Sequence, residues 1–593
     1  VSGAGALTKA GSGSLLMTGV STYSGPTTVA AGTLAIGDAA HANAALTGGG
    51  ATTVAAGATL GGYGSVTGAV TNNGTLAVAN AVPSFASAGN GAFSINGSLV
   101  NAGLVQIGGP AAAGVGNLLN VTGNYAGQNG TIGLNTVVAG DGAASDRLVL
   151  SGGTATGSTH LQVTNVGGQG AQTVADGIQL IQATNGATTD ASAFTLAAPV
   201  KAGAYSYYLA KGGVSGGTTD NWYLRNTVAP LPPGVTPPPP VTTPGEPPAV
   251  EPGVPLAAEG TPPLPPAPAA GSAATPLYRV EVPVYAAAPG VARELGLMQI
   301  DTFHDRQGDQ ALLNDSGKLP AAWGRVWGGH SVLSQDGAAS PQFDGSVYGI
   351  QAGQDLYADR SASGQRNHYG LFVGFARATG DVDGFALGMP NLAVGHLAVN
   401  AYSLGGYWTH IGPSGWYTDA VLMGSSLTVD PASRDGLNTT THGNAVTGSL
   451  EGGLPIPLGA GLTLEPQAQL VWQHLSLSDF NDGVSSVGFN SGNTFVGRIG
   501  ARLQGQFDAF ATAWRPYLRV SLLREFGSDD KVTFGGGTVI PGNVGQTAAQ
   551  LGAGVVGKFS TSGSVFATLG WVTNLGGAHQ RTVTGDAGVR WVW

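Results

Sequence analysis

The feature that most constrains the fold of this chain is an alternation of apolar and polar side chains, with a period of two residues, across residues 320–593. Ile499 falls on one face of such a segment, for example, and its neighbour Arg498 on the other. A strand points successive side chains to opposite faces, so the pattern predicts strands with one apolar and one polar side. We count twelve such segments, and they are longer than the ~5–6 residues that are usual in soluble sheets.

The twelve segments favour a closed barrel that spans a membrane. An even number of antiparallel strands is typical of single-chain membrane barrels, and closure pairs the backbone amides without leaving an edge. The apolar faces carry aromatic side chains near their ends, as the girdles of membrane barrels do. No run of about 18 apolar residues occurs, so a membrane-spanning helix is excluded. The residues that we expect to face a wet lumen are Glu465, Arg498, Arg502, Arg515, Arg519 and Arg590.

One helix is expected before the barrel, at about residues 290–313. Asp301, Asp305 and Asp309 are four residues apart, which places them along one acidic stripe of that helix. A twelve-stranded barrel is wider than the ~8-stranded type that side chains alone fill, so the helix could thread the pore. Its acidic stripe would then meet the arginines that face the lumen. An amphipathic helix outside the barrel remains the alternative.

Residues 1–226 predict a different all-β structure. Short strand-like pieces rich in Thr, Val and Leu are separated by Gly, Asn or Ala-Gly turns, and the whole chain contains 100 glycines. Residues 28–34 and 53–60 form an internal repeat, Thr-Val-Ala-Ala-Gly followed by Thr-Leu or Ala-Thr-Leu. Short repeated strands of this kind are typical of a parallel β-helix, in which stacked rungs share one core. A β-sandwich is the alternative.

A proline-rich segment joins these two regions. Residues 227–276 contain eighteen prolines, among them the unbroken run Pro237–Pro240. This composition predicts an extended, semi-rigid linker that cannot pack a core of its own. The domains that we expect are therefore 1–226, the linker 227–276, a further linker with the pore-threading helix over 277–319, and the barrel over 320–593.

Charge and motifs exclude several classes of function. Charged residues make up 9% of the chain, against about 25% in a typical domain, and the net charge is −10, which argues against nucleic-acid binding. Cysteine is absent, so the chain has no disulfide and no thiolate metal site. The one G-x-S-x-G segment, Gly213–Gly217, lies between two strand-like pieces, where a turn is expected instead of a nucleophile elbow. The ten His residues form no H-E-x-x-H pattern, and we predict no catalytic residue, no metal site and no cofactor.

Several short sequences carry a family resemblance. These are Asp301-Thr-Phe-His-Asp-Arg in the expected helix, Trp323-Gly-Arg-Val-Trp in the first expected strand, and the final Val589-Arg-Trp-Val-Trp593. Residues 7–36 are similar to the passenger-associated transport repeat, and Asn221-Trp-Tyr-Leu-Arg resembles the end of a pertactin-like passenger. The chain thus resembles a classical autotransporter (type Va secretion) of the pertactin-like group.

The resemblance implies an all-β protein: a right-handed parallel β-helix passenger, a Pro-rich linker, a pore helix and a 12-stranded antiparallel transmembrane β-barrel. The barrel would lie in the lipid of the bacterial outer membrane, and the passenger would be displayed at the cell surface. Residues of about 130–226 resemble an autochaperone segment, which would fold first. The outward side chains Val589, Trp591 and Trp593 would be recognised by the barrel assembly machinery, and periplasmic chaperones are further expected partners.

The resemblance also implies that the passenger is non-enzymatic and adhesive or virulence-related, with contacts to host cells or to other copies of itself. Two alternatives remain open. One is a porin-like channel with an unrelated surface domain, and the other is a β-helical carbohydrate-active enzyme on an autotransporter anchor. The chain starts inside a repeat, so we expect further sequence upstream, including a signal peptide.

Overall fold

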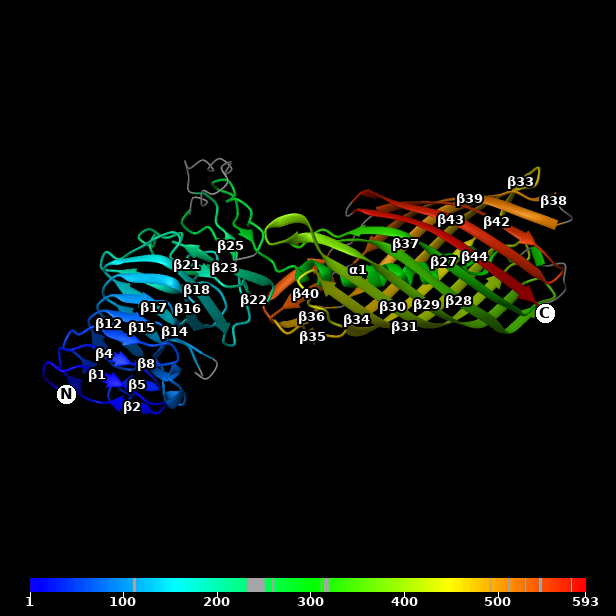
Figure 1. Cartoon of the computed structure of the whole chain (residues 1–593). Coiled ribbons are helices and arrows are strands. Elements are labelled where there is room, and N and C mark those ends of the chain that lie inside the picture. Colours follow the sequence, from blue (N-terminus) through cyan, green and yellow to red (C-terminus); the bar gives the residue numbers. More distant parts are fainter. Residues whose placement is uncertain are drawn as a thin grey trace. The chain divides into compact units, whose positions relative to one another are not determined.

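The computed structural model describes residues 1–109, 114–231, 251–258, 261–310, 312–313, 319–490, 492–509, 512–527, 530–542, 547–576 and 579–593. The chain forms two compact units, Val1–Arg279 and Val280–Trp593, and strands dominate both (Figure 1).

The first unit is a parallel β-helix whose short strands stack in three columns, and this prediction is confirmed. Each strand pairs in parallel with the equivalent strand of the neighbouring rungs, so that Thr28 lies beside Thr8 on one side and beside Thr53 on the other. The first column holds β1 (Leu7–Lys9), β4 (Thr27–Val29), β7 (Thr52–Val54), β10 (Val70–Asn72) and β13 (Leu99–Asn101). The second holds β2 (Ser14–Met17), β5 (Thr33–Ile36), β8 (Thr59–Gly62), β11 (Thr75–Val78) and β14 (Leu104–Gln106). The third holds β3 (Val20–Ser21), β6 (Ala45–Leu46), β9 (Ser65–Thr67), β12 (Ala92–Asn96), β15 (Leu118–Val121), β17 (Arg147–Ser151) and β19 (Ile178–Thr184).

Longer strands and tight turns complete this stack. The strands β16 (Tyr125–Thr136) and β18 (Thr154–Asn165) continue both of the first two columns, and β20 (Thr188–Thr189) and β21 (Phe194–Leu196) pair with β18. Two 3-10 turns, η1 (Ala79–Ala81) and η2 (Pro83–Phe85), connect β11 to β12. At the turn before β5, Gly32 has φ +68° and a Cβ there would lie 2.3 Å from the Gly13 carbonyl oxygen, so the turn requires glycine.

The core of the β-helix is a ladder of aliphatic side chains, one above another. Val29, Leu34, Val54, Leu60 and Leu76 are all 0% exposed. A single rung would leave each of them open to water, whereas full burial of such a side chain contributes roughly 1.5–3 kcal/mol. Stacking therefore supplies the core that no rung has by itself.

An antiparallel cap with a larger core closes the C-terminal end of the β-helix. It consists of β22 (Val200–Ala202), β23 (Tyr205–Lys211) and β24 (Trp222–Arg225), which pairs with β19. The Phe194 ring lies 5.6 Å from the Tyr125 ring and 5.4 Å from the Trp222 ring, measured between centroids. The Trp222 indole donates to the Thr189 hydroxyl at 3.0 Å, so the polar atom of this buried ring is satisfied.

The described parts of the Pro-rich segment pack on this cap, a contact that the composition of the segment did not indicate. The strand β25 (Thr227–Val228) pairs with β26 (Thr275–Pro276), and the Leu256 amide donates to the Leu209 carbonyl at 2.8 Å. Past β26, Tyr278 stacks on Tyr205 with 5.5 Å between the ring centroids. The exposed backbone of the cap provides partners that composition alone does not reveal. Residues 232–250 and 259–260 of the predicted linker lie outside the described residues.

The second unit contains a closed antiparallel barrel of twelve strands in the part of the chain that the structure describes, as predicted. Neighbours in sequence pair with each other, and the first strand pairs with the last from Ala321–Val592 to Leu333–Gln580. The strands are β27 (Ala321–Ser334), β28 (Gln342–Arg360), β29 (Arg366–Ala386), β30 (Met389–Ile411), β31 (Tyr417–Ser433), β32 (Thr441–Gly453), β34 (Leu462–Leu477), β37 (Asn493–Gln504), β39 (Thr512–Phe526), β42 (Thr547–Lys558), β43 (Gly563–Gly576) and β44 (Gln580–Val592).

The outer surface of the barrel is an apolar belt. Ile350, Val373 and Leu404 are 53%, 57% and 60% exposed on neighbouring strands. Exposed aromatic rings lie toward both ends of this belt, Tyr348 and Tyr402 toward one and Tyr357, Tyr369 and Trp408 toward the other. Such exposure would be unfavourable in water and matches the lipid-facing surface and girdles of a membrane barrel.

The two ends of the barrel differ. At one end the strands are joined mainly by short turns, with the small strands β33 (Ile456–Gly459) and β38 (Phe507–Ala509). At the other end longer loops form a four-stranded sheet, which consists of β35 (Phe480–Asn481), β36 (Ser486–Asn490), β40 (Asp530–Phe534) and β41 (Thr538–Gly542). Short periplasmic turns and longer extracellular loops are the rule in outer-membrane barrels, so the loop sheet marks the outer end.

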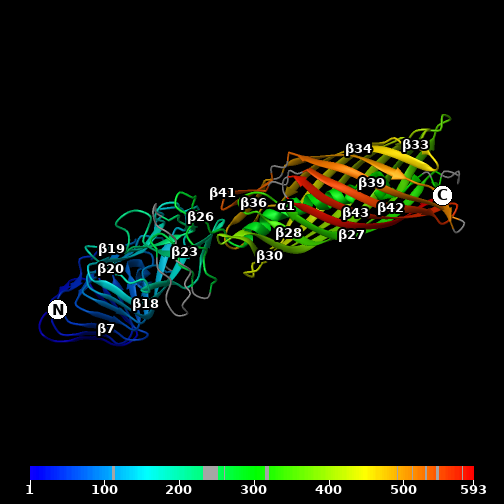
Figure 2. The same cartoon turned by 90° about the horizontal axis from the view of Figure 1, so that it is seen from above.

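Helix α1 (Glu281–Ile300) lies inside the barrel and is followed by the short α2 (Phe303–Gln307), as Figure 1 and Figure 2 show. The predicted bounds of 290–313 are wrong. The helix starts nine residues earlier, because Pro283 sits in the first turn, where a missing N–H costs nothing, and Pro289 is accommodated inside a helix in which all residues but Leu297 and Met298 are buried. The helix ends at Asp301, whose φ of +45° breaks it. No helix among the described residues is long and apolar enough to cross a membrane.

Candidate functional site in the barrel lumen

Helix α1 packs against one side of the barrel wall. Its backbone approaches β28 to β32, β34 and the loop strands β40 and β41 far more closely than β39, β42, β43 or β44 in the part of the chain that the structure describes. Ile300 and Leu297 pack into an apolar cluster with Phe372, Val421 and Met423, which point inward from this side. This cluster fixes the position of the C-terminal half of the helix by burial of large apolar side chains.

Amide side chains of the same side bind the carbonyl groups of the helix. Gln351 donates to the Gln299 carbonyl at 3.0 Å, Gln469 to that of Asp301 at 2.7 Å and Gln473 to that of Arg293 at 3.1 Å. The Arg325 guanidinium adds bonds of 2.9 and 2.8 Å to the carbonyls of Met298 and Gln299. The bonds to Met298, Gln299 and Asp301 satisfy carbonyl groups at the end of α1 that have no partner in the helix, and the bond to Arg293 adds a contact in its middle.

The loop sheet holds α1 from Tyr285 to Arg293. Arg293 forms two bonds of 2.7 Å to the carboxylate of Asp530, and both side chains are at most 4% exposed. The Tyr285 ring lies between Phe480 and Phe534, at 5.3 and 6.1 Å between centroids. The helix and the loop sheet therefore pack against each other at the outer end of the lumen.

At the opposite end, α2 places charged side chains against strands on several sides of the lumen. Arg306 binds Asp419 of β31 at 2.5 Å, and His304 binds Glu465 of β34 at 2.8 Å. The amide of Phe303 donates to Glu451 of β32 at 2.9 Å. A five-residue helix thus binds to distant strands at once and closes the lumen at the end with short turns.

The three predicted aspartates all contact arginines of the wall. Asp305 is paired with Arg519, and the Asp305 carboxylate also accepts from the Thr302 hydroxyl at 2.7 Å. Asp309 lies 3.0 Å from a guanidinium nitrogen of Arg515. Asp301 lies 3.7 Å from Arg498 and 3.4 Å from Arg325.

The prediction that the three aspartates form one acidic stripe of a single helix, however, is wrong. Asp301 is the residue at which α1 ends, Asp305 belongs to α2, and Asp309 follows α2 beyond Gly308. The left-handed backbone at Asp301 breaks the helical periodicity on which the stripe was based. The aspartates meet the arginines because the chain turns across the lumen, and not because they share one helix face.

Two other predicted lumen residues have different surroundings. The Arg590 guanidinium donates to the Gln307 side chain at 2.8 Å. The Arg502 guanidinium lies 4.0 Å over the centre of the Tyr517 ring, and it has no hydrogen-bond partner among the described residues. Glu465 and all five predicted arginines therefore point toward the lumen side of the wall.

Sequence reasoning missed other lumen residues with equally strong contacts, namely Asp419, Glu451, Arg325 and Arg293. The first three occupy polar positions in the alternating strand pattern, which was a usable signal. Arg293 carried no such signal, because its partner Asp530 lies 237 residues later in a loop.

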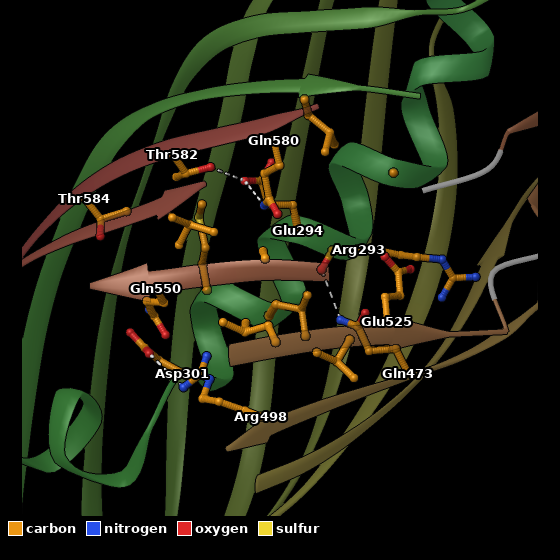
Figure 3. A pocket seen from close by; sticks show the side chains of 18 of the residues that line it. Arg293, Glu294, Asp301, Gln473, Arg498, Glu525, Gln550, Gln580, Thr582 and Thr584 are labelled. Carbon is orange, nitrogen blue, oxygen red and sulfur yellow. Dashed lines mark hydrogen bonds and ion pairs between the residues drawn. The ribbon is translucent and has the colours of Figure 1, made fainter. Parts of the chain in front are cut away.

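A small cavity of about 120 Å³ remains on the side of α1 that does not pack against the wall (Figure 3). From the helix it is lined by Gly290, Arg293, Glu294, Leu297 and Asp301. Across from them lie side chains of β39, β42, β43 and β44, namely Leu523, Glu525, Ala548, Gln550, Val572, Gln580, Thr582, Thr584 and Asp586. The lining also includes Trp327 and Leu333 of β27, Gln473 of β34, and Val496 and Arg498 of β37. Glu294 crosses this gap and accepts bonds of 2.6 Å from Ser331 and 3.0 Å from Thr582.

Of the outward residues proposed for recognition by other proteins, Val589 and Trp591 lie on the lipid-facing side of β44, and Trp593 directly follows this strand. Val589, Trp591 and Trp593 are 51%, 47% and 44% exposed. In the β-helix, Ser215 of the G-x-S-x-G segment lies in a turn, where its amide donates to Asp176 at 2.8 Å. Across the described residues, no group of three or more His, Asp or Glu side chains is placed to hold a metal ion.

Three family models match the chain. The autotransporter beta-domain matches residues 322–570, the Autochaperone Domain Type 1 matches 94–209, and the passenger-associated-transport-repeat matches 7–36. The autochaperone match starts and ends earlier than the segment of about 130–226 that resembles it by sequence inspection. The barrel match falls within the twelve strands, and the other two fall within the β-helix.

The chain is similar to named autotransporters. It is 30% identical to the adhesin BmaC autotransporter of Brucella suis biovar 1, over 64% of this chain and 10% of that protein. It is 30% identical to the pertactin autotransporter of Bordetella bronchiseptica, over 77% of this chain and 47% of that protein. The chain thus spans less than half of the length of either relative.

Among solved structures, the transport unit of the autotransporter AIDA-I from Escherichia coli is matched with a TM-score of 0.45 and 18% identity, over 53% of this chain and 100% of that one. The family models and the named relatives agree on one family. The protein therefore belongs to the autotransporters, with a barrel in the bacterial outer membrane and a β-helix passenger at the cell surface.

Proposed function

We propose that this chain exports its own β-helix through the barrel and holds it on the cell surface as a non-enzymatic adhesin. The observation that carries the proposal is the position of α1. This helix follows the β-helix in the chain and lies inside the lumen, with its first residues at the loop-sheet end. The polypeptide that precedes α1 therefore leaves the pore on the extracellular side.

The composition of the β-helix suits passage through a narrow pore. Residues 1–226 contain five Lys or Arg and six Asp, and no Cys. Few charges must be desolvated in the lumen, and no disulfide can fix a fold in the oxidising periplasm. Each rung that stacks outside the cell buries apolar surface, which opposes return of the chain.

The test of export is the surface exposure of the passenger. Protease added to intact cells should degrade residues 1–129 of the complete chain, and deletion of 130–226 should reduce this exposure strongly while the barrel remains folded. Undiminished display of 1–129 from the deleted chain would contradict the role of the C-terminal rungs. A complete chain that stays in the periplasm would contradict export itself.

Adhesion is proposed because the relatives with assigned names include an adhesin and because the β-helix presents regular neutral polar surfaces. Thr8, Thr28, Thr53 and Thr71 lie in register on neighbouring strands of the first column. Host-cell surfaces and other copies of the passenger are the proposed partners. Cells that display the chain should adhere to epithelial layers or to each other more than cells with the barrel alone, and turnover of glycans by the displayed passenger would contradict a non-enzymatic role.

The barrel assembly machinery is the proposed partner of β44, through Val589, Trp591 and Trp593. Replacement of Trp593 by Ala should lower the amount of folded barrel in the outer membrane, whereas Trp571→Ala serves as a matched control on β43, where Trp571 is 40% exposed to lipid. Periplasmic chaperones are proposed to hold the chain before assembly, and their deletion should lower the yield of both variants equally.

A further inference from the structure

We propose that, during export, the moving part of the passenger slides along the inner surface of β39, β42, β43 and β44, here called the open wall, while the α1 segment stays on the opposite side. This inference rests on the proposed function. It follows from the asymmetric position of α1, which lies against the opposite side of the lumen and leaves a cavity between itself and the open wall (Figure 3).

The side that binds α1, formed by β28 to β32 and β34 and here called the seated wall, is unsuited to a sliding chain. Large apolar side chains such as Phe372 and Met423 point inward there and are at most 2% exposed. Together with the amide donors Gln351 and Gln469, they hold the helix along its C-terminal half. A segment bound by burial and by several hydrogen bonds exchanges slowly, so this side suits the stationary segment.

The open wall offers a different surface. Its inward positions along the cavity are mostly small or neutral polar, as Ala548, Gln550, Thr582 and Thr584 show. The Gln550 side-chain oxygen is buried without a hydrogen-bond partner among the described residues, and so is one carboxylate oxygen of Glu294 across the cavity. Unpaired polar atoms of this kind can form brief hydrogen bonds with a passing backbone, and among the nine side chains of the open wall that line the cavity only Leu523 and Val572 are large and apolar.

The passenger matches this wall in chemistry. Residues 1–226 are dominated by Gly, Ala, Thr, Ser and Val with eleven charged side chains. Small side chains let an extended strand lie close to the wall, and few charges meet Glu525 and Asp586, which line the cavity. The cavity runs along α1 from Gly290 to Asp301, roughly 16 Å at 1.5 Å per residue.

The structure represents the state after export, because both ends of this path are closed. The loop sheet covers the outer end through Arg293–Asp530, and α2 closes the inner end through Asp305–Arg519 and Arg306–Asp419. The remaining 120 Å³ is the part of the path that neither closure fills. Export requires both closures to be open while α1 remains seated.

Site-specific photo-crosslinking in the complete chain tests this assignment. The photoreactive residue p-benzoylphenylalanine replaces Gln550 or Thr584 on the open wall, or Thr447 of the seated wall, which lies beside Gly296 of α1. A fast-folding domain fused before Val1 stalls the passenger inside the pore. We expect Gln550 and Thr584 to crosslink mainly to residues of 1–226 in the stalled chain, and Thr447 to crosslink to residues 281–300 in both stalled and unstalled chains.

Two outcomes would overturn the inference: adducts to the passenger mainly from Thr447, or adducts to α1 alone from Gln550 and Thr584. Export of the unstalled chain to protease-accessible surface is measured in parallel. If the unstalled chain is exported but either of these two crosslinking results is found, the path along the open wall is rejected and the proposed function stands. If the unstalled chain is not exported, the proposed function is rejected.

A steric variant provides an independent measurement. Thr584→Trp narrows the open wall and should slow the appearance of passenger at the surface several-fold, whereas Thr584→Ala should leave it unchanged. Heat-modifiable gel mobility of both variants verifies that the barrel is folded. Equal export rates for the Thr584→Trp and Thr584→Ala variants, both with folded barrels, would contradict a path along the open wall.

Discussion

At the scale of single residues, the lumen depends on charges that are buried and paired. Asp305 and Arg519 are 1% and 4% exposed, and the pair is supported by the Thr302 hydroxyl. Two buried charges of this kind gain little over an apolar pair of the same size. Loss of one partner, however, leaves the other charge buried without an opposite charge beside it, and this strongly destabilises the folded barrel.

We therefore predict that Arg519→Met destabilises the folded barrel by about 3–5 kcal/mol. The double variant with Asp305→Asn should regain most of this loss, because no uncompensated carboxylate remains. Arg377→Met is the matched control, since Arg377 points outward and donates to Asn400 at 2.9 Å. The measurement is the shift of the unfolding midpoint in denaturant, and an equal loss for the single and double variants would refute the argument.

A second residue-scale prediction concerns the cap of the β-helix at alkaline pH. Burial raises the pKa of Tyr278 to about 12, and it also raises the pKa values of Tyr207 and Tyr125. A folded-state pKa above the unfolded value of about 10 means that the unfolded chain releases its proton first. The stabilisation is thus complete below pH 10 and is lost as the pH rises from 10 to 12.

Ionisation of Tyr278 in the unfolded chain lowers the free energy of unfolding by roughly 1.4 kcal/mol per pH unit in this window. Tyr278→Phe should make the free energy of unfolding fall less steeply with pH between 10 and 12. Residues 275–279 should then resist protease at higher pH than in the wild type. Tyr348→Phe, on the outer surface of the barrel, is the control. The measurement is limited proteolysis of the complete chain in detergent at pH 9 to 12, and a slope unchanged by Tyr278→Phe would disprove the assignment.

At the scale of elements, strands were more predictable than helices. In β37 the alternating pattern separates Ile499, which is 63% exposed to lipid, from Arg502, which is 2% exposed in the lumen. The difference in exposure follows from the alternation of apolar and polar residues within one strand, so it can be predicted from a short stretch of sequence. The start of α1 could not be predicted from the sequence, because a proline inside a helix is unfavourable locally and Pro289 is tolerated only because the helix is buried in the barrel.

The partners of the charged residues were equally beyond local reasoning. Arg293 and Asp530 meet only because the loop sheet folds over the helix. The packing of residues 251–258 and 275–279 on the cap was hidden for the same reason, since proline content describes the segment and not the surface that receives it. Tertiary contacts between distant segments thus decided what the sequence pattern left open.

The element with the clearest separate role is α2. It binds β31, β34 and β39 through Arg306, His304 and Asp305. Replacement of all three by Ala should free α2 while α1 stays on its wall, and the conductance of the protein in planar bilayers should rise several-fold. Thr428→Ala, His396→Ala and Asp383→Ala, on the outward faces of their strands, form the control triple. Unchanged conductance in a folded barrel would show that α2 does not close the lumen.

At the scale of the whole molecule, the barrel must match the thickness of the bilayer. Leu404 lies in the middle of the apolar belt and is 60% exposed, whereas His396 lies on the same outward face of β30, past the aromatic residue Tyr402. An arginine at the midplane costs about 2–4 kcal/mol, against ~0–1 near the interface. Leu404→Arg should therefore lower the folded fraction far more than His396→Arg, as measured by heat-modifiable mobility after refolding in lipid vesicles.

The joint between β27 and β44 has one more consequence. Trp323 is paired with Arg590, and Ala322 with Trp591, so each strand alternates between lumen and lipid in step with the other. A slip by a single residue would turn Arg590 toward the acyl chains and Trp591 into water. Closure of the barrel therefore selects the register of this pair. The first and last strands, which are more than 240 residues apart in the chain, can join only when lumen-facing and lipid-facing side chains match on both.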